Sequence, residues 1–145
     1  MAKVLSINIS EKKGTPKTKI NPGVLIEDFG FEGDAHAGKW HRQVSLLAKE
    51  SIDKSKGLPS DGLCHGVFAE NITTEGIILH TLPVGTRLTV GECVLEITQI
   101  GKECHDGCAI RQLVGQCIMP REGIFCRVIS GGKVYDNDEI CVVEP

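Results

Sequence analysis

The stretch Thr86-Arg87-Leu88-Thr89-Val90-Gly91-Glu92-Cys93-Val94-Leu95-Glu96-Ile97-Thr98-Gln99-Ile100 contains two strand patterns joined by a short turn. In each half apolar and polar residues alternate with a period of two, which is typical of a half-buried β-strand. Gly91-Glu92 between them is a turn signal. The stretch therefore predicts a β-hairpin near the middle of the chain.

Similar strand patterns recur on both sides of this hairpin, at 3–10, 23–29, 43–47, 67–73, 124–129, 133–135 and 139–143. Two short segments, 49–55 and 109–114, have helical spacing. Helices do not alternate with the strands, which argues against a parallel α/β sheet. Many short strands, with 17 glycines in the chain, predict a mainly β fold. We expect a closed or partly open β-barrel of short strands with two small helices.

Length and charge indicate a single domain and argue against binding to nucleic acid or membrane. The 145 residues suit a single domain spanning 1–145. A net charge of −3 disfavours nucleic-acid binding, which usually needs a basic face. No apolar run approaches the roughly 20 residues that span a membrane, and the first residues do not resemble a signal peptide. We expect a cytoplasmic protein that binds neither nucleic acid nor membrane.

Seven cysteines are an odd number, so they cannot all pair within one chain. In a reducing cytosol they are expected to be thiols, metal ligands or nucleophiles. Three of them lie within apolar strand patterns and are predicted to be small buried hydrophobes; these are Cys93, Cys126 and Cys141. Cys64 lies in a Gly-rich loop, and its role is left open. The group left for chemistry is Cys104, Cys108 and Cys117.

Cys104 lies in Gly101-Lys102-Glu103-Cys104-His105-Asp106-Gly107-Cys108, directly after the long strand pattern that ends at Ile100. A thiol at a strand end is accessible to ligands while a rigid scaffold holds it. The neighbouring Lys102 and His105 favour the thiolate, which is the form that attacks or binds metal. The alternative is a zinc site formed by Cys104, Cys108, Cys117 and His105. Its spacings of three and eight intervening residues differ from paired Cys-x-x-Cys knuckles.

Two further polar groups are candidate binding residues. Between Gly33 and Arg42 the chain concentrates polar side chains, namely Asp34, His36, Lys39, His41 and Arg42. Cationic side chains beside glycine backbone suit a phosphate group. Asn71 and Thr73 offer directional donors and acceptors at a strand end. The alternative for them is a turn that satisfies its own backbone. Dinucleotide, phosphate-loop and serine-hydrolase motifs are absent from the sequence.

The order of several blocks resembles the MOSC domain, the C-terminal module of molybdenum cofactor sulfurases, which also occurs as small stand-alone bacterial proteins. The blocks that carry the resemblance are Gly33–Gly38, Arg42–Leu47, Phe68–Ile77, Leu82–Leu88, the thiol Cys104, Gly123–Val128 and Gly131–Val134. One departure is Ala69-Glu70-Asn71, where the family usually has Gly-Glu-Asn. Another is the thiol-rich segment after Cys104.

The resemblance implies a β-barrel that binds molybdenum cofactor, a pterin with a dithiolene and a phosphate. By motif position Cys104 is the catalytic thiol, which ligates molybdenum or carries sulfur. Cys108, Cys117 and His105 are further candidate metal ligands. The remaining polar residues are expected to bind the cofactor: Asp34, His36, Lys39, His41, Arg42, Asn71 and Thr73.

The implied function is cofactor sulfuration or delivery, or molybdenum-dependent reduction of N-hydroxylated compounds. The protein would then be a sulfur transferase or an oxidoreductase. Expected partners are a sulfur donor protein, a molybdoenzyme client or a redox partner. Pyridoxal phosphate belongs to a separate domain of full-length sulfurases and is not expected here. The alternative function is a non-catalytic zinc- or iron-binding interaction module that uses Cys104, Cys108 and Cys117.

Overall fold

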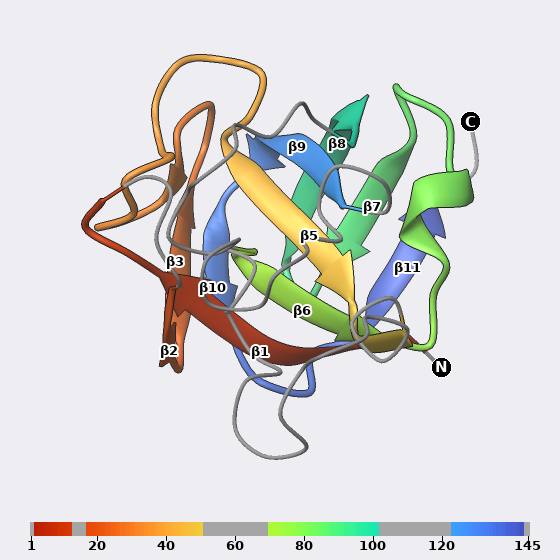
Figure 1. Ribbon diagram of the computed structural model, residues 1–145, viewed down its shortest axis with the longest axis horizontal. Helices are drawn as coiled ribbons and strands as arrows, with labels where there is room; N and C mark the ends of the chain where they lie inside the picture. The colour runs from red at the N-terminus through yellow and green to blue at the C-terminus, as the bar shows by residue number, and fades with distance from the viewer. Residues whose placement is uncertain (1, 13–16, 51–69, 102–122, 144–145) are drawn as a thin grey trace, which may run out of the picture.

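The computed structural model describes residues 2–12, 17–50, 70–101 and 123–143. These residues form a mainly β fold, as predicted (Figure 1). The strands are β1 (Lys3–Ile9), β2 (Thr18–Ile20), β3 (Gly23–Ile26), β4 (Gly30–Phe31), β5 (Val44–Ala48), β6 (Ile72–Glu75), β7 (Arg87–Val90), β8 (Cys93–Ile100), β9 (Ile124–Ser130), β10 (Gly132–Val134) and β11 (Ile140–Val143).

Eight strands form one sheet in the order β11-β7-β8-β9-β5-β6-β1-β2, and β10-β3-β4 form a second, smaller sheet. All neighbours in the large sheet are antiparallel except β5 and β6, which run parallel. The predicted hairpin is confirmed, because β7 and β8 pair from Val90↔Cys93 to Arg87↔Glu96.

The large sheet is not closed into a barrel, which corrects the closed form of the prediction. The first and last described strands, β1 and β11, are linked by an isolated bridge between Lys3 of β1 and Glu139, the residue before β11. Backbone hydrogen bonds adjoin this bridge on both sides, from Ile140 N to Ala2 O and from Val4 N to Asp138 O, each at 2.9 Å. The two edge strands of the large sheet are therefore β11 and the three-residue β2.

The two predicted small helices are not seen in the described part of the chain. Of the segment 49–55 only Lys49 and Glu50 are described, and both are helical; the segment 109–114 lies outside the described residues. The complete helical element in the described ranges is the 3-10 turn η1 (Leu79–Thr81). No helix within those ranges is long and apolar enough to span a membrane.

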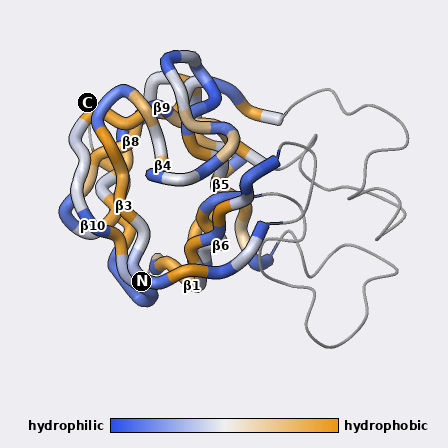
Figure 2. The backbone as a smooth tube through the Cα atoms, turned by 90° about the vertical axis from the view of Figure 1, so that its left-hand side faces the viewer, coloured by the Kyte–Doolittle hydropathy of each residue, from blue (hydrophilic) through white to orange (hydrophobic). Residues whose placement is uncertain are grey.

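The core forms where the strand periodicity places apolar side chains on one face. Leu88, Leu95 and Ile97 of the hairpin are fully buried, and residues from both ends of the chain, including Val4 and Ile140, pack in the same cluster. Figure 2 shows the hydrophobic stretches along the strands and the hydrophilic ones in many of the connections. Burial of this continuous apolar surface is the main force that holds the sheets together.

The predicted burial of three cysteines is confirmed for two of them. Cys93 and Cys126 have no exposed surface, whereas Cys141 is exposed. The prediction for Cys141 is wrong because it lies on the edge strand β11, where only Ile140 is buried. An apolar run in the sequence does not distinguish an edge strand from a central one.

Candidate functional site

The connection between β4 and β5, residues 33–42, is called the polar loop. Two backbone hydrogen bonds hold it in place. Ala35 N donates to Ser10 O, just after β1, at 2.8 Å, and Gly38 N donates to Phe29 O, just before β4, at 2.7 Å. Gly30, which precedes the loop, has φ +124°, and a Cβ there would meet Gln43 O at 2.6 Å. Both ends of the loop thus approach closely, which only glycine permits at this position.

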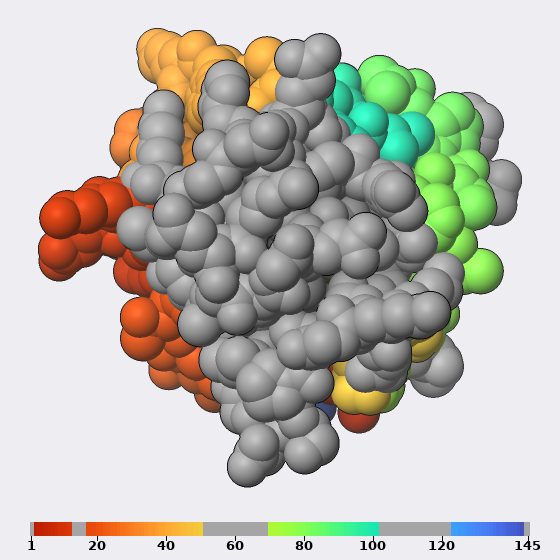
Figure 3. All heavy atoms as spheres, in the orientation of Figure 1, coloured from red at the N-terminus to blue at the C-terminus, as the bar shows by residue number. Residues whose placement is uncertain are grey.

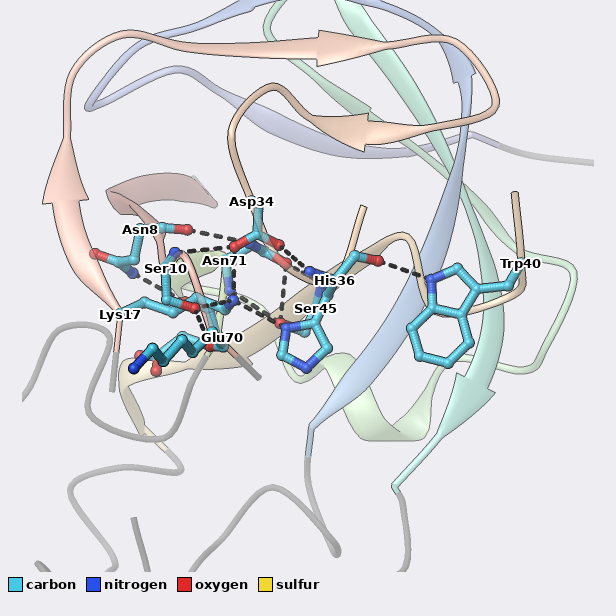
Figure 4. Close-up of polar contacts among 10 residues, drawn as sticks. Asn8, Ser10, Lys17, Asp34, His36, Trp40, Ser45, Glu70 and Asn71 are labelled. Carbon is cyan, nitrogen blue, oxygen red and sulfur yellow. Dashed lines mark hydrogen bonds and ion pairs between the residues drawn. The ribbon is translucent and has the colours of Figure 1, made fainter. Parts of the chain in front are cut away.

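The first half of the polar loop carries a buried ion pair (Figure 4). Lys17 Nζ donates to Asp34 Oδ1 at 2.6 Å, and both side chains have no exposed surface. Asp34 also accepts hydrogen bonds from Ser10 N at 3.1 Å and His36 N at 3.2 Å. A charge pair in a low-dielectric interior persists only when its remaining donors and acceptors are paired in this way.

His36 also contacts Lys17, and this contact determines which ring nitrogen of His36 carries the proton. Lys17 Nζ lies 3.0 Å from His36 Nδ1. An ammonium group has donors and no acceptor, so Nδ1 accepts and carries no proton. The remaining ring proton of His36 therefore lies on Nε2. Asp34 and His36, both predicted as ligand-binding residues, are thus tied to Lys17, which the sequence pattern had left in a charged loop.

A second set of buried polar side chains joins β1, β5 and β6, and Figure 4 shows it beside the first. Asn71 Oδ1 accepts from Ser45 N at 2.9 Å, and its Nδ2 donates to Asn8 O at 3.1 Å. Asn8 Nδ2 donates to Thr73 Oγ1 at 3.3 Å, and that hydroxyl donates to Glu70 Oε2 at 2.8 Å. These side chains connect different strands, so Asn71 and Thr73 do more than satisfy a local turn.

Two buried oxygens in this region have no hydrogen-bond partner among the described residues: Asn8 Oδ1 and Thr74 Oγ1. We call the residues of both sets the buried polar network; its members are Asn8, Ser10, Lys17, Asp34, His36, Ser45, Glu70, Asn71 and Thr73. Most of its donors and acceptors are already used within the protein, which suits a role in holding the loop and strands in place.

The second half of the polar loop forms an exposed group, which we call the Arg42 cluster: Trp40, His41, Arg42 and Gln99. Gln99 Oε1 lies 2.9 Å from His41 Nε2 and accepts from Arg42 Nε at 3.1 Å. Because this oxygen is the acceptor for both, His41 Nε2 carries a proton. Lys39 is exposed at the start of this group, and no described side chain forms an ion pair with it.

The Arg42 cluster adjoins the base of the segment that carries Cys104. Gln99 Nε2 donates to Gly101 O at 2.7 Å, and Gly101 N donates to Gly123 O at 2.7 Å. Gly101 and Gly123, the described residues on either side of 102–122, are therefore neighbours in space. Cys104, His105, Cys108 and Cys117 themselves lie outside the described residues.

The three described cysteines are poor nucleophiles. Burial, followed by the charges of Glu92 and Asp138, raises the pKa of Cys93 to about 11. Burial, and then Glu96, raises the pKa of Cys126 well above its ordinary range. Cys141 is exposed, but its hydrogen bond to Glu139 raises its pKa. None of these three thiols is favoured as a thiolate.

Two surface hollows lie outside the Arg42 cluster, and the first of them includes Ser10 of the buried polar network and Gly33 of the polar loop. One, of about 650 Å³, is lined by Ile9, Ser10, Glu11, Lys12, Thr18, Ile20 and Gly33. The other, of about 570 Å³, is lined by Leu82, Pro83, Val84, Gly85, Thr86, Arg87, Val142 and Val143. In Figure 3 the segments at the start of the chain (red) and around residue 80 (green) lie at opposite edges of the view. Neither hollow has Arg42 or Asn71 among its described lining residues.

Sequence reasoning missed four residues that organise these groups: Asn8, Lys17, Glu70 and Gln99. Asn8, Lys17 and Gln99 each have a hydrogen-bond partner that is distant in the sequence. Glu70 had one available signal, since it directly precedes Asn71 in a block already selected. No local pattern distinguishes Lys17 from the other lysines around it.

Comparison with known families identifies the family of this chain. The MOSC domain model matches residues 33–141, a span that contains the polar loop, Asn71, Gln99 and Cys104. The chain belongs to the MOSC domain family. None of the curated proteins matches it.

Three solved structures share the fold. The YuaD protein of Bacillus subtilis superimposes with a TM-score of 0.77 at 20% identity, over 96% of this chain and 93% of that one. YiiM from Geobacillus stearothermophilus gives a TM-score of 0.73 at 18% identity, over 99% and 76% of the two chains. YiiM from Escherichia coli gives 0.66 at 21% identity, over 100% and 71%. At these identities the similarity establishes the fold.

Proposed function

We propose that this MOSC-family protein binds molybdenum cofactor, or sulfur destined for it, between the Arg42 cluster and the segment that carries Cys104. The observation that supports this most directly is the double use of Gln99. Its carbonyl oxygen holds Arg42 and His41, while its amide holds Gly101, three residues before Cys104. One side chain thus links the cationic groups to the base of the thiol segment.

The described donors fit the anionic end of such a cofactor. Arg42 uses Nε for Gln99, and its two Nη groups have no hydrogen-bond partner among the described residues. Lys39 provides a second cation. Arg side chains with free, coplanar N–H groups bind phosphate through paired hydrogen bonds. When bound, the cofactor would supply the molybdenum centre, for which a cysteine thiolate is a suitable soft ligand.

The protein's own residues then divide into two roles. Lys39, His41 and Arg42 contact the anionic group, and Cys104 carries persulfide sulfur or ligates the metal. Asp34, His36, Asn71 and Thr73 position the polar loop and the strands beneath it. Cofactor sulfuration or delivery and reduction of N-hydroxylated compounds both use this arrangement. We further propose that the chain is a single domain, because Val4 and Ile140 share one core, and that it acts in the cytoplasm.

The test is metal and sulfur content. The wild-type protein, produced in cells that synthesise molybdenum cofactor, should contain molybdenum or cyanide-releasable sulfur. Cys104→Ser should lose most of it. Cys141→Ser is the matched control, because Cys141 is an exposed thiol on the far edge strand. Equal contents in wild type and Cys104→Ser would rule out the role assigned to Cys104.

A zinc- or iron-binding module is a second candidate. It is supported by the hydrogen bond between Gly101 N and Gly123 O, which brings together the ends of the segment containing Cys104, His105, Cys108 and Cys117. A metal held by these four ligands would cross-link that segment. Elemental analysis separates the two functions. Stoichiometric zinc without molybdenum or labile sulfur, together with destabilisation by a chelator, supports the second one.

A further inference from the structure

Trp40 is the one tryptophan of the chain, and it lies on the surface of the polar loop. The residue is 36% exposed, so part of this large ring faces solvent. The ring is nevertheless fixed, because Nε1 donates to His36 O at 2.7 Å. Figure 4 shows Trp40 extending beyond His36, away from Lys17 and Asp34. An exposed aromatic ring held in one orientation is a ready surface for stacking.

A cation lies beside this ring and is also held in place. The Arg42 guanidinium carbon is 5.9 Å from the centre of the Trp40 ring and 5.3 Å from that of Phe125. These are cation–π distances, so the charge is kept next to the aromatic surface. His41 meets Trp40 edge-on, with ring centres 5.7 Å apart and planes at 68°. An aromatic surface and hydrogen-bond donors for an anion therefore occur within three consecutive residues.

We propose that Trp40 and Arg42 together form a recognition site for a flat heteroaromatic anion. The heterocycle stacks on the exposed part of the Trp40 ring, and its anionic group binds Arg42 and Lys39. This inference rests on the proposed function and deepens it, since it assigns recognition of the pterin ring to Trp40. A purely structural role for Trp40, as an anchor that holds the loop through His36, is the competing explanation.

The probe is pterin-6-carboxylate, a flat heteroaromatic anion without metal or dithiolene, and pyrophosphate is the non-aromatic comparison. Binding is measured by calorimetry. Trp40→Leu should weaken pterin-6-carboxylate binding by about tenfold or more, the usual scale for loss of one stacking partner. The same variant should bind pyrophosphate within about twofold of wild type. Arg42→Gln should weaken binding of both probes.

Trp40→Phe separates stacking from anchoring. It keeps an aromatic face but cannot donate to His36 O, so it should recover most of the pterin affinity if stacking matters. Affinity that stays low in Trp40→Phe and falls equally for both probes would mean that Trp40 only anchors the loop. Wild-type affinity in Trp40→Leu, or no binding of pterin-6-carboxylate to the wild type, would also overturn the proposal.

A measurement on the wild type avoids dependence on the folding of any variant. Since Trp40 is the single tryptophan, its fluorescence reports on this site alone. Pterin-6-carboxylate should protect Trp40 from quenching by acrylamide, and pyrophosphate should not. Equal quenching with and without the pterin, after correction for its absorbance, contradicts stacking.

The two proposals fail separately. If the wild type holds molybdenum cofactor and Trp40→Leu holds as much with unchanged pterin affinity, the stacking site is wrong and the proposed function stands. If the protein acquires neither molybdenum nor sulfur but binds pterin-6-carboxylate through Trp40, the proposed function is wrong and the recognition site stands.

Discussion

The two halves of the polar loop differ in what their charges are used for. In the first half Asp34 is buried and paired with Lys17, and its remaining contacts are to backbone N–H groups. In the second half Arg42 is partly exposed and engages Gln99 through one of its nitrogens. A buried charge must be fully compensated within the protein, whereas an exposed one keeps donors for a ligand. One short loop thus contains both an anchor and a binding surface.

The largest predicted effect is on stability, at the anchor. Asp34→Asn keeps the size and a carbonyl acceptor but removes the carboxylate charge that pairs with the buried Lys17 ammonium. We expect a loss of about 3–5 kcal/mol in the free energy of unfolding, measured with urea. Glu32→Gln, at an exposed neighbour in the same segment, is the control and should change little. A loss below about 1 kcal/mol in Asp34→Asn would show that the ion pair is not needed to hold the loop.

A smaller loss of stability is expected where the buried polar network connects β1 and β6. Thr73→Val conserves shape but removes the hydroxyl that accepts from Asn8 and donates to Glu70. Leaving these buried groups without a partner should cost about 1–3 kcal/mol. Thr18→Val, on the exposed face of β2, serves as the comparison in the same denaturation experiment. Equal stability of the two variants would contradict the assignment of Thr73 to the scaffold.

A substitution in the second half of the polar loop should affect ligand binding more than stability. Arg42→Gln removes a partly exposed cation with one side-chain hydrogen bond and two ring contacts. Its free energy of unfolding should fall by no more than about 1 kcal/mol. Pyrophosphate affinity, followed by calorimetry, should nevertheless drop by about tenfold, as expected when one charge-assisted contact is lost. Unchanged affinity together with a large loss of stability would reverse the roles of the two halves.

The smallest predicted effect concerns thiol reactivity. Here the contrast lies between the exposed Cys141 and the buried Cys93 and Cys126. Glu139 raises the pKa of Cys141 through a hydrogen bond, so less thiolate is present near pH 8 than in a free thiol. Glu139→Gln removes the negative charge, lowers that pKa and should raise the rate of alkylation by iodoacetamide a few-fold. Peptide mass spectrometry identifies the modified thiol. In the folded protein Cys93 and Cys126 should stay unmodified, since both are buried.

Several parts of this picture could be predicted from local pattern. The alternation in 86–100 predicts the β7–β8 hairpin, and the structure has it in that register. The density of polar residues in 33–42 singles out the loop that carries both groups. Two short strands, β2 and β4, escaped prediction because two or three residues are too few to show a period.

The sequence by itself determined which residues alternate, where the turns fall and which loop is polar, because these properties depend on neighbours within a few positions. It also carried the order of blocks that marks a MOSC domain. Tertiary structure decided the rest. Lys17 reaches Asp34 across 17 positions, His41 reaches Gln99 across 58 and Asn8 reaches Glu70 across 62. Which polar group becomes an anchor and which stays available depends on burial, and burial is set by strand order, not by local pattern.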